Sequence, residues 1–207
     1  MKFLFAVIAF IASIVLATPA SEHYTLHSTN DVLANSAITP FWLEGPITPG
    51  GPEIRLNGTA KQIYEQIISL NPSYDPYNFP EFAAQQQAKG ISRQEFHKRN
   101  VNCDWGSWVE DSNRCAEGFD YLRRLGTARC GAYANSCSRV SCSHNCGVWL
   151  CSSVNREIGV HCYDIANTDM RRIIEVCGRR WLGDRYIMVR GNINWGAHNV
   201  GVGSDSC

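Results

Sequence analysis

The sequence has no cysteine before position 103 and no lysine after position 98. Basic and acidic residues balance at 19 each, so no net charge draws the chain to nucleic acid or to an anionic membrane. Outside the first 17 residues, no apolar run is long enough to span a bilayer. These absences argue against a nucleic-acid-binding or multi-span membrane protein, and they divide the chain into two parts of different composition.

The first 17 residues have the pattern of a secretory signal peptide. Met1-Lys2 gives a short basic start, residues 3–16 form an apolar run, and the small side chain of Ala17 suits a signal peptidase. The run is shorter than the ~20 apolar residues that a membrane span needs. We therefore expect a secreted, extracellular protein with no transmembrane segment in its mature form.

The cysteines predict a disulfide framework. Four of the ten lie in the segment 137–151, CSRVSCSHNCGVWLC, and the others flank it on both sides. An even number of cysteines in an exported chain favours disulfides. Ten cysteines allow about 945 pairings, so the connectivity stays open. We expect disulfides at Cys103, Cys115, Cys130, Cys137, Cys142, Cys146, Cys151, Cys162, Cys177 and Cys207.

Residues 18–99 are predicted to be rich in loops, with short helices. Proline and glycine interrupt residues 18–56. Thr59 and Gln62 form a capping box at the start of a helix that ends at Asn71, and residues 81–89 form a second helix. Asn57 begins the only N-glycosylation sequon, Asn-Gly-Thr, and we expect it to be an exposed glycosylation site.

The dipeptide Lys98-Arg99 lies at the boundary between the two parts of the chain. It resembles the dibasic sites that kexin-type proteases cut late in the secretory pathway. The alternative is an ordinary basic pair at the C-terminal end of a helix, where positive charge suits the helix dipole. The position at the boundary favours processing, which makes residues 18–99 a pro-region and residues 100–207 the mature domain.

Residues 100–207 predict an α+β domain. Helices are expected at 115–125 and 165–177, each with one apolar stripe, and Asp164 can cap the second. Strands are expected at 101–105, 148–152, 158–163, 185–190 and 198–203, with turns at 153–157 and 191–196. Without long crossovers, this order favours a disulfide-rich α/β sandwich, with two helices on a mainly antiparallel sheet of four to five strands.

This arrangement resembles the small α/β-sandwich killer toxins of fungi, of the killer-protein-four type. The resemblance lies in a Val-Asn-Cys strand at Cys103, a helix that ends in Cys177-Gly and a hairpin that closes at Cys207. The segment 137–151 is also similar to cysteine-rich secreted proteins of filamentous fungi, some of which resemble host-necrosis effectors. The resemblance covers residues 100–207 and implies a toxin or effector. The channel-blocking toxins depend on a lysine, which these residues lack.

A zinc site is one alternative use of the cysteines. Cys142, His144, Cys146, His161 and Cys162 have spacings compatible with zinc. The export signal and the even cysteine count favour disulfides instead. We therefore expect no metal and no cofactor.

A secreted ribonuclease is the enzymatic alternative. It would use His144, His161 or His198 with Glu117 or Glu157 as general acid and base. Nothing in the spacing brings these residues together. We therefore assign no catalytic residue and keep a ribonuclease-like hydrolase as the runner-up.

Two arginine pairs are candidates for target binding. If the two predicted helices lie side by side, Arg123, Arg124, Arg171 and Arg172 share one outer face that suits an anionic partner. The alternative is that neighbouring acidic residues neutralise them.

Three tryptophans, Trp105, Trp108 and Trp195, are either sugar-stacking platforms or half-buried packing residues. We expect a monomeric, non-enzymatic secreted toxin or effector of fungal type that binds an extracellular target: a channel, a host protein or a wall polysaccharide. Nucleic acid is not an expected partner. A non-toxic, wall-associated protein is the third alternative.

Overall fold

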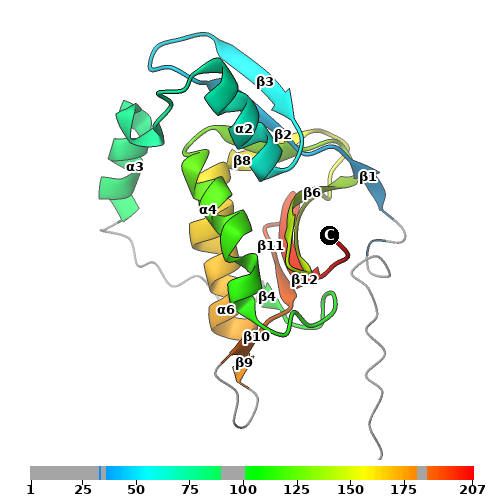
Figure 1. The fold of residues 1–207 in the computed structure, drawn as a ribbon. Helices are drawn as coiled ribbons and strands as arrows, with labels where there is room; N and C mark the ends of the chain where they lie inside the picture. The colour runs from blue at the N-terminus through cyan, green and yellow to red at the C-terminus, as the bar shows by residue number, and fades with distance from the viewer. Residues whose placement is uncertain (1–32, 34–35, 90–100, 181–185) are drawn as a thin grey trace, which may run out of the picture.

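The computed structural model describes residues 33, 36–89, 101–180 and 186–207, and Figure 1 shows how they are arranged. Helices α4 (Ala116–Arg124) and α6 (Arg171–Cys177) lie on one side of a six-stranded sheet, and the C-terminus lies on the other. A four-stranded sheet, with helix α2 (Ala60–Leu70) beside it, continues the fold at one end.

The six-stranded sheet has the order β1-β6-β7-β12-β11-β4. All neighbours pair antiparallel except β1, which runs parallel to β6. The β6–β7 turn contains His144 and Asn145, both with positive φ angles, as tight hairpin turns require. The strands are β1 (Ala37–Thr39), β4 (Val101–Asn102), β6 (Ser136–Ser143), β7 (Cys146–Ser152), β11 (Gly191–Asn194) and β12 (His198–Ser204).

The four-stranded sheet is antiparallel and has the order β3-β2-β5-β8. Its inner strand β2 comes from the cysteine-free part and pairs directly with β5 of the cysteine-rich part. The strands are β2 (Trp42–Pro46), β3 (Glu53–Asn57), β5 (Arg129–Ala132) and β8 (Ile158–His161). A separate pair joins β9 (Arg179–Arg180) to β10 (Ile187–Met188).

The helices begin and end largely where the sequence predicts. Thr59 caps α2 in a complete capping box with Gln62, and the helix stops before Asn71. The second predicted helix of residues 100–207 is one continuous segment with a π-helical middle. The remaining elements are η1 (Pro76–Asn78), α3 (Pro80–Lys89), η3 (Ser112–Cys115), α5 (Cys162–Asp164) and η4 (Ile165–Met170).

One hydrophobic core unites the two parts of the chain. Burial of a large apolar side chain contributes about 1.5–3 kcal/mol, so these residues hold the parts together without a disulfide between them. The cysteine-free part contributes Phe41, Leu43, Ala60, Ile63, Ile67, Tyr74, Phe79 and Phe82. The cysteine-rich part contributes, among others, Phe119, Leu122, Leu125, Ile165, Met170 and Ile173.

The ten cysteines form five disulfides, which confirms the predicted framework. All five lie between residues 103 and 207, so none ties residues 33–89 to the rest. The pairs are Cys103–Cys177, Cys115–Cys146, Cys130–Cys162, Cys137–Cys151 and Cys142–Cys207.

The α+β class is confirmed, but the predicted sheet arrangement is wrong. The described residues form two larger sheets instead of one of four to five strands, and the cysteine-free part supplies β1, β2 and β3. The prediction of loops over residues 18–56 is therefore wrong at residues 37–39, 42–46 and 53–56. Proline and glycine mark the ends of these short strands rather than the absence of strands.

Local predictions in residues 100–207 also need correction. Residues 191–196 are not a turn, because β11 occupies most of them and pairs with β12. The strand predicted at 185–190 shrinks to β10, and the one at 101–105 to β4. Asp164 lies inside the helical segment and makes no capping hydrogen bond, because helix α5 already begins at Cys162. Residues 153–157 connect β7 and β8, which belong to different sheets.

Candidate functional site

Residues of the six-stranded sheet alternate between its two faces. Leu150 of β7 belongs to the core beneath the helices. Its neighbours Trp149 and Cys151 therefore face the opposite side, where they pair with Gly201 and Asn199 of β12. We call this side, opposite the helices, the outer face.

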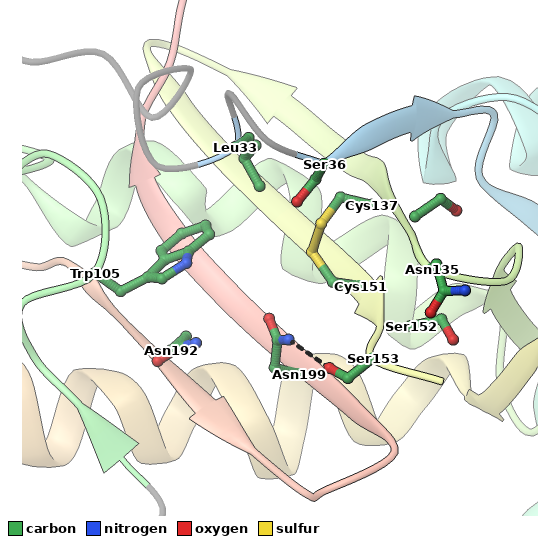
Figure 2. A pocket seen from close by; sticks show the side chains of 11 residues that line it. Leu33, Ser36, Trp105, Asn135, Cys137, Cys151, Ser152, Ser153, Asn192 and Asn199 are labelled. Atoms are coloured by element: carbon green, nitrogen blue, oxygen red, sulfur yellow. Dashed lines mark hydrogen bonds between the residues drawn. A yellow bond between two sulfur atoms is a disulfide. The ribbon is translucent and has the colours of Figure 1, made fainter. Parts of the chain in front are cut away.

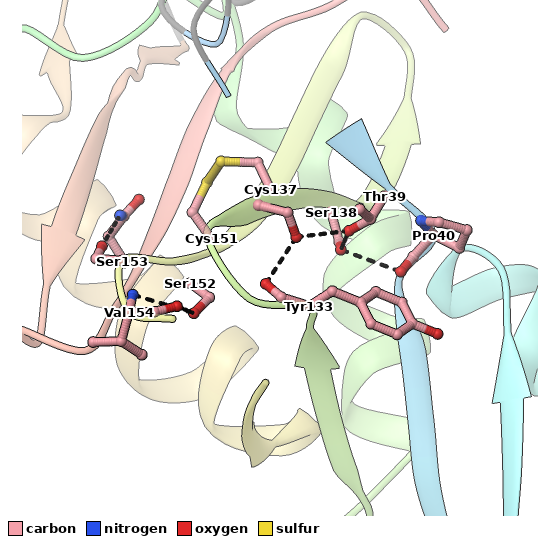
Figure 3. The surroundings of a disulfide bond; sticks show 11 residues. Thr39, Pro40, Tyr133, Cys137, Ser138, Cys151, Ser152, Ser153 and Val154 are labelled. Carbon is pink, nitrogen blue, oxygen red and sulfur yellow. Dashed lines mark hydrogen bonds between the residues drawn. A yellow bond between two sulfur atoms is a disulfide. The ribbon is translucent and has the colours of Figure 1, made fainter. Parts of the chain in front are cut away.

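A disulfide forms the floor of the outer face. Cys137 of β6 and Cys151 of β7 are direct partners in the ladder, with 4.0 Å between their Cα atoms (Figure 3). Both are buried and pack with Leu33 and Trp149 in a small second cluster, separate from the main core. The bond fixes β6 and β7 together at the surface.

A pocket of about 320 Å³ lies over this disulfide (Figure 2). Among the described residues that line it, none has an acidic, basic or histidine side chain. Asn135, Asn192 and Asn199 supply hydrogen-bond donors and acceptors together with Ser36 and Ser153, and one tryptophan supplies an aromatic surface. The other two serines are buried, and their hydroxyl groups are bonded within the protein. The lining residues are Leu33, Ser36, Trp105, Asn135, Ser136, Cys137, Cys151, Ser152, Ser153, Asn192 and Asn199.

Trp105 forms one wall of the pocket and is half-buried. Its ring lies directly over Gly201, where an added Cβ atom would come within 2.5 Å of the ring carbons Cη2 and Cζ3. Only glycine at position 201 leaves room for the ring in this position. The sequence of β12 therefore sets the placement of Trp105.

Hydrogen bonds fix the polar side chains at the rim. Asn199 donates from Nδ2 to Ser153 Oγ at 3.3 Å, as Figure 2 shows. Ser136 donates to the carbonyl oxygen of Tyr133 at 2.8 Å and lies 2.9 Å from the hydroxyl of Thr39 on β1. The bond of Asn199 links β12 to the segment after β7, and the contact of Ser136 with Thr39 links β6 to β1.

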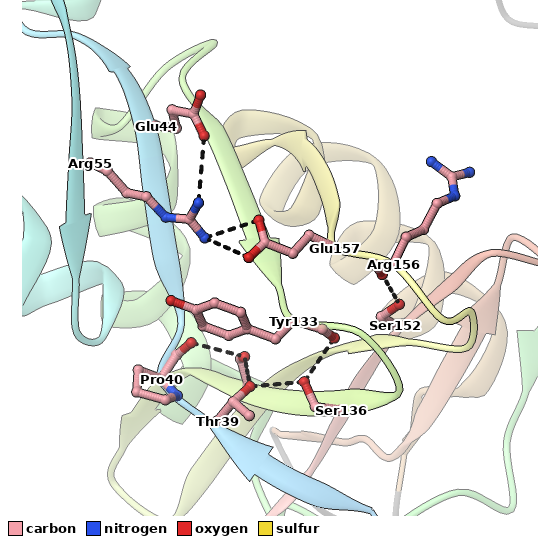
Figure 4. A network of polar contacts seen from close by, with 10 residues as sticks. Thr39, Pro40, Glu44, Arg55, Tyr133, Ser136, Ser152, Arg156 and Glu157 are labelled. Atoms are coloured by element: carbon pink, nitrogen blue, oxygen red, sulfur yellow. Dashed lines mark hydrogen bonds and ion pairs between the residues drawn. The ribbon is translucent and has the colours of Figure 1, made fainter.

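An arginine network joins the cysteine-free part to the connection before β8 (Figure 4). Arg55 of β3 donates from Nη2 to both carboxylate oxygens of Glu157, at 3.2 and 3.1 Å. Its guanidinium carbon lies 4.3 Å from the centre of the Trp42 ring, a cation–π arrangement. The other guanidinium nitrogen, Nη1, is 4.0 Å from Glu44.

Two further polar contacts cross between the parts. The Tyr74 hydroxyl donates to the carbonyl oxygen of Leu125 at 3.2 Å, and burial raises the pKa of Tyr74 above its ordinary value. Lys61 of α2 lies 3.2 Å from the carboxylate of Glu117 on α4. The interface therefore has both an apolar core and directional polar contacts.

The arginine pair of α4 is exposed and engaged locally. Arg123 forms an ion pair with Asp120 at 2.8 Å and donates from Nε to Asn167 at 3.0 Å. The guanidinium carbon of Arg124 lies 5.5 Å from the ring centre of Tyr64 on α2. Both arginines thus contact neighbouring elements.

The arginine pair of α6 shares one acidic partner. Arg171 lies 2.9 Å and Arg172 lies 3.6 Å from the carboxylate of Glu175. Helix α4 contacts η4, the segment that precedes α6, through Arg123 and Asn167. Ion pairs engage three of the four arginines, and their role in target binding remains a prediction.

Of the two predicted modification sites, the structure describes only the glycosylation site. Asn57 ends β3 with an exposed side chain, and its carbonyl oxygen accepts from Gln66 Nε2 at 3.1 Å. Glycan attachment there remains a prediction. Lys98-Arg99 lies outside the described residues.

The residues of the hydrolase alternative are brought together only in part. Glu117 and His144 line one pocket of about 140 Å³. His161 contacts a backbone carbonyl elsewhere, through Nδ1. His198 lies on β12, where burial lowers its pKa, and Glu157 is held in the arginine network.

The cysteines of the zinc alternative have no thiolate to offer. Cys142, Cys146 and Cys162 are each in a disulfide. Within the described ranges, no group of three or more histidine, cysteine, aspartate or glutamate side chains could hold a metal ion.

A larger pocket, of about 590 Å³, lies between the two parts of the chain. Tyr74 and Phe79 supply aromatic surface to it, and the side chains that line it carry charges of both signs. The charged residues and the histidine are Glu44, Glu53, Glu81, Arg129 and His161. This pocket exists only while the two parts remain together.

No protein-family model, curated protein or solved structure matches the chain. Among the helices within the described residues, none has the length and apolar character to cross a bilayer. The fold and site define a disulfide-stabilised α+β protein with a neutral, polar pocket on one sheet face.

Sequence reasoning missed most residues of this pocket. Trp105 was a candidate for sugar stacking, but Asn135, Asn192 and Asn199 had no predicted role. The alternation of polar and apolar residues in 191–194 was the available signal, because it places Asn192 opposite Ile193 of the core.

Proposed function

We propose that the chain is the precursor of a secreted toxin or effector that acts by binding a target outside the cell. The observation that carries this proposal is the outer face, where the Cys137–Cys151 disulfide holds a polar pocket rigidly at the surface. A preorganised surface of this kind loses little conformational entropy on binding. Five disulfides are typical of proteins that work in an oxidising, extracellular compartment.

The active molecule in this proposal retains residues 33–89. Strand β2 and eight core residues of that part are packed into the cysteine-rich part. Cleavage after Arg99 then produces two chains that stay associated without a disulfide. The finer identity, a fungal killer-toxin type, rests on the resemblance of residues 100–207 alone.

A ribonuclease-like hydrolase is the second candidate, favoured by the shared pocket of Glu117 and His144. That pocket, of about 140 Å³, is smaller than the ~300–1,000 Å³ typical of small-molecule sites. The carboxylate of Glu117 is also paired with Lys61. The geometry therefore favours binding over hydrolysis.

The test applies purified, secreted protein to plant and fungal cells and measures cell viability. Loss of viability that disappears after reduction and alkylation of the disulfides supports the proposal. The same preparation is incubated with RNA, alongside the H144Q variant. RNA turnover that H144Q abolishes, without an effect on cells, overturns the proposal in favour of the hydrolase.

A further inference from the structure

We propose that the pocket over the Cys137–Cys151 disulfide binds a neutral sugar ring of an oligosaccharide. This inference rests on the proposed function and names the ligand class of its site. It follows from three properties of the pocket: the absence of charge, the density of amide and hydroxyl groups, and the placement of Trp105.

The lack of charged side chains among the described lining residues disfavours acidic and basic ligands. A phosphate, sulfate or uronate that leaves water is held most strongly by a cationic partner, and none of these lining residues supplies one. An amine needs a carboxylate for the same reason, and the lining has none. A neutral polar ligand remains.

The lining also disfavours a purely apolar ligand. Small-molecule pockets are usually lined by apolar side chains with a few polar groups, whereas most residues here carry an amide or a hydroxyl. Asn135, Asn192 and Asn199 each offer a carbonyl acceptor and two N–H donors. Sugar hydroxyls both donate and accept, so they match these groups.

Trp105 supplies the contact that a sugar ring needs in addition to hydrogen bonds. The face of an indole ring carries partial negative charge and attracts positively polarised C–H groups such as those on one face of a pyranose. Packing against Gly201 holds the ring in place. Asn192 is the ladder partner of Gly201, so its amide lies beside the ring (Figure 2).

The volume sets the size of the bound unit. About 320 Å³ is at the lower end of the ~300–1,000 Å³ found for small-molecule sites. This suits one sugar ring in the pocket, with the rest of the oligosaccharide lying along the outer face.

The test measures binding of uncharged hexasaccharides to the whole secreted protein by calorimetry. The probes are β-1,3-glucan, β-1,4-glucan, chitin and mannan hexamers, with oligogalacturonate as the charged comparison. At least one neutral probe is expected to bind, and W105A and N192A are each expected to weaken it about tenfold, the effect of one lost contact. The control variants W108A and N113A, at positions outside the pocket, leave the affinity unchanged.

Folding of each variant is checked by circular dichroism and by intact mass. If W105A fails to fold, N192A and N199A provide the same test from two strands. Absence of binding to every neutral probe overturns the inference, as does binding that W105A and N192A leave unchanged or a preference for oligogalacturonate. If the protein kills cells but binds none of the neutral probes, the inference of a sugar site is wrong and the proposed function still holds.

Discussion

Trp42 of β2 occupies the space that Gly131 of β5 leaves open. The two residues are partners in the β2–β5 ladder, and a Cβ atom on Gly131 would overlap the Trp42 ring. Trp42 is only 1% exposed. It is this deeply buried although its part of the chain has no cysteine and so no disulfide to hold it. The cysteine-free part is thus built into the fold of the disulfide-linked part.

Replacing Trp42 with alanine tests this packing. The W42A variant is expected to lose about 3–5 kcal/mol of unfolding free energy, as large-to-small changes of buried aromatics do. Urea unfolding of the whole chain measures the loss. W108A removes a tryptophan that is only half-buried and should lower the unfolding free energy clearly less. Equal costs for the two variants would contradict the packing described here.

The disulfides are expected to differ in their contribution to stability. Cys103–Cys177 closes 74 residues and Cys137–Cys151 closes 14. Because of loop-closure entropy, removing the longer link is expected to lower the unfolding free energy by about 1.5 kcal/mol more than removing the shorter one. Unfolding of the C103A/C177A and C137A/C151A double variants, each with the other four bonds intact, measures the difference. A larger loss of unfolding free energy in C137A/C151A would show that packing in the folded state outweighs chain entropy.

The half-buried His198 of β12 makes the unfolding free energy depend on pH. Burial lowers the pKa of His198 below its ordinary value of 6.5, so the folded protein holds the ring neutral to lower pH than the unfolded chain does. The contribution of His198 to the unfolding free energy is therefore expected to be constant well above pH 6.5 and to fall as pH drops through 6.5. Unfolding curves across this range should show a smaller decrease for H198N. An unchanged pH slope in H198N would rule out this linkage.

Much of the helical structure can be predicted because its signals are local. A capping box marks α2, and single apolar stripes mark α4 and α6. Strands β1, β2 and β3 have only three to five residues each, and β1 and β2 pair with strands far along the chain. Such pairing depends on distant partners, so a local pattern cannot reveal it.

The site was less predictable than the fold. The cysteine pattern predicts disulfides, but only the ladder register brings Cys137 opposite Cys151. Asn192 and Asn199 become neighbours of Trp105 only when β11 and β12 pair beside β7. Such neutral side chains have no distinctive spacing, so sequence analysis gives more weight to charged residues such as Arg171, which here has a local ion-pair partner.

The exposed sequon predicts that the secreted protein is glycosylated. Protein secreted from a fungal host is expected to carry one N-linked glycan at Asn57, because its side chain is exposed at the end of β3. Intact mass before and after enzymatic deglycosylation, with N57Q as the control, measures it. A secreted wild-type protein of unmodified mass would contradict the prediction.

The mass of the secreted protein under native and denaturing conditions tests most directly whether the two parts form one fold. We expect one native species that contains both parts. Under denaturing conditions, without reduction, it should separate into a chain that begins at Asn100 and a chain that ends at Arg99, because no disulfide joins them. A native species of residues 100–207 alone would contradict the claim that the two parts form one fold.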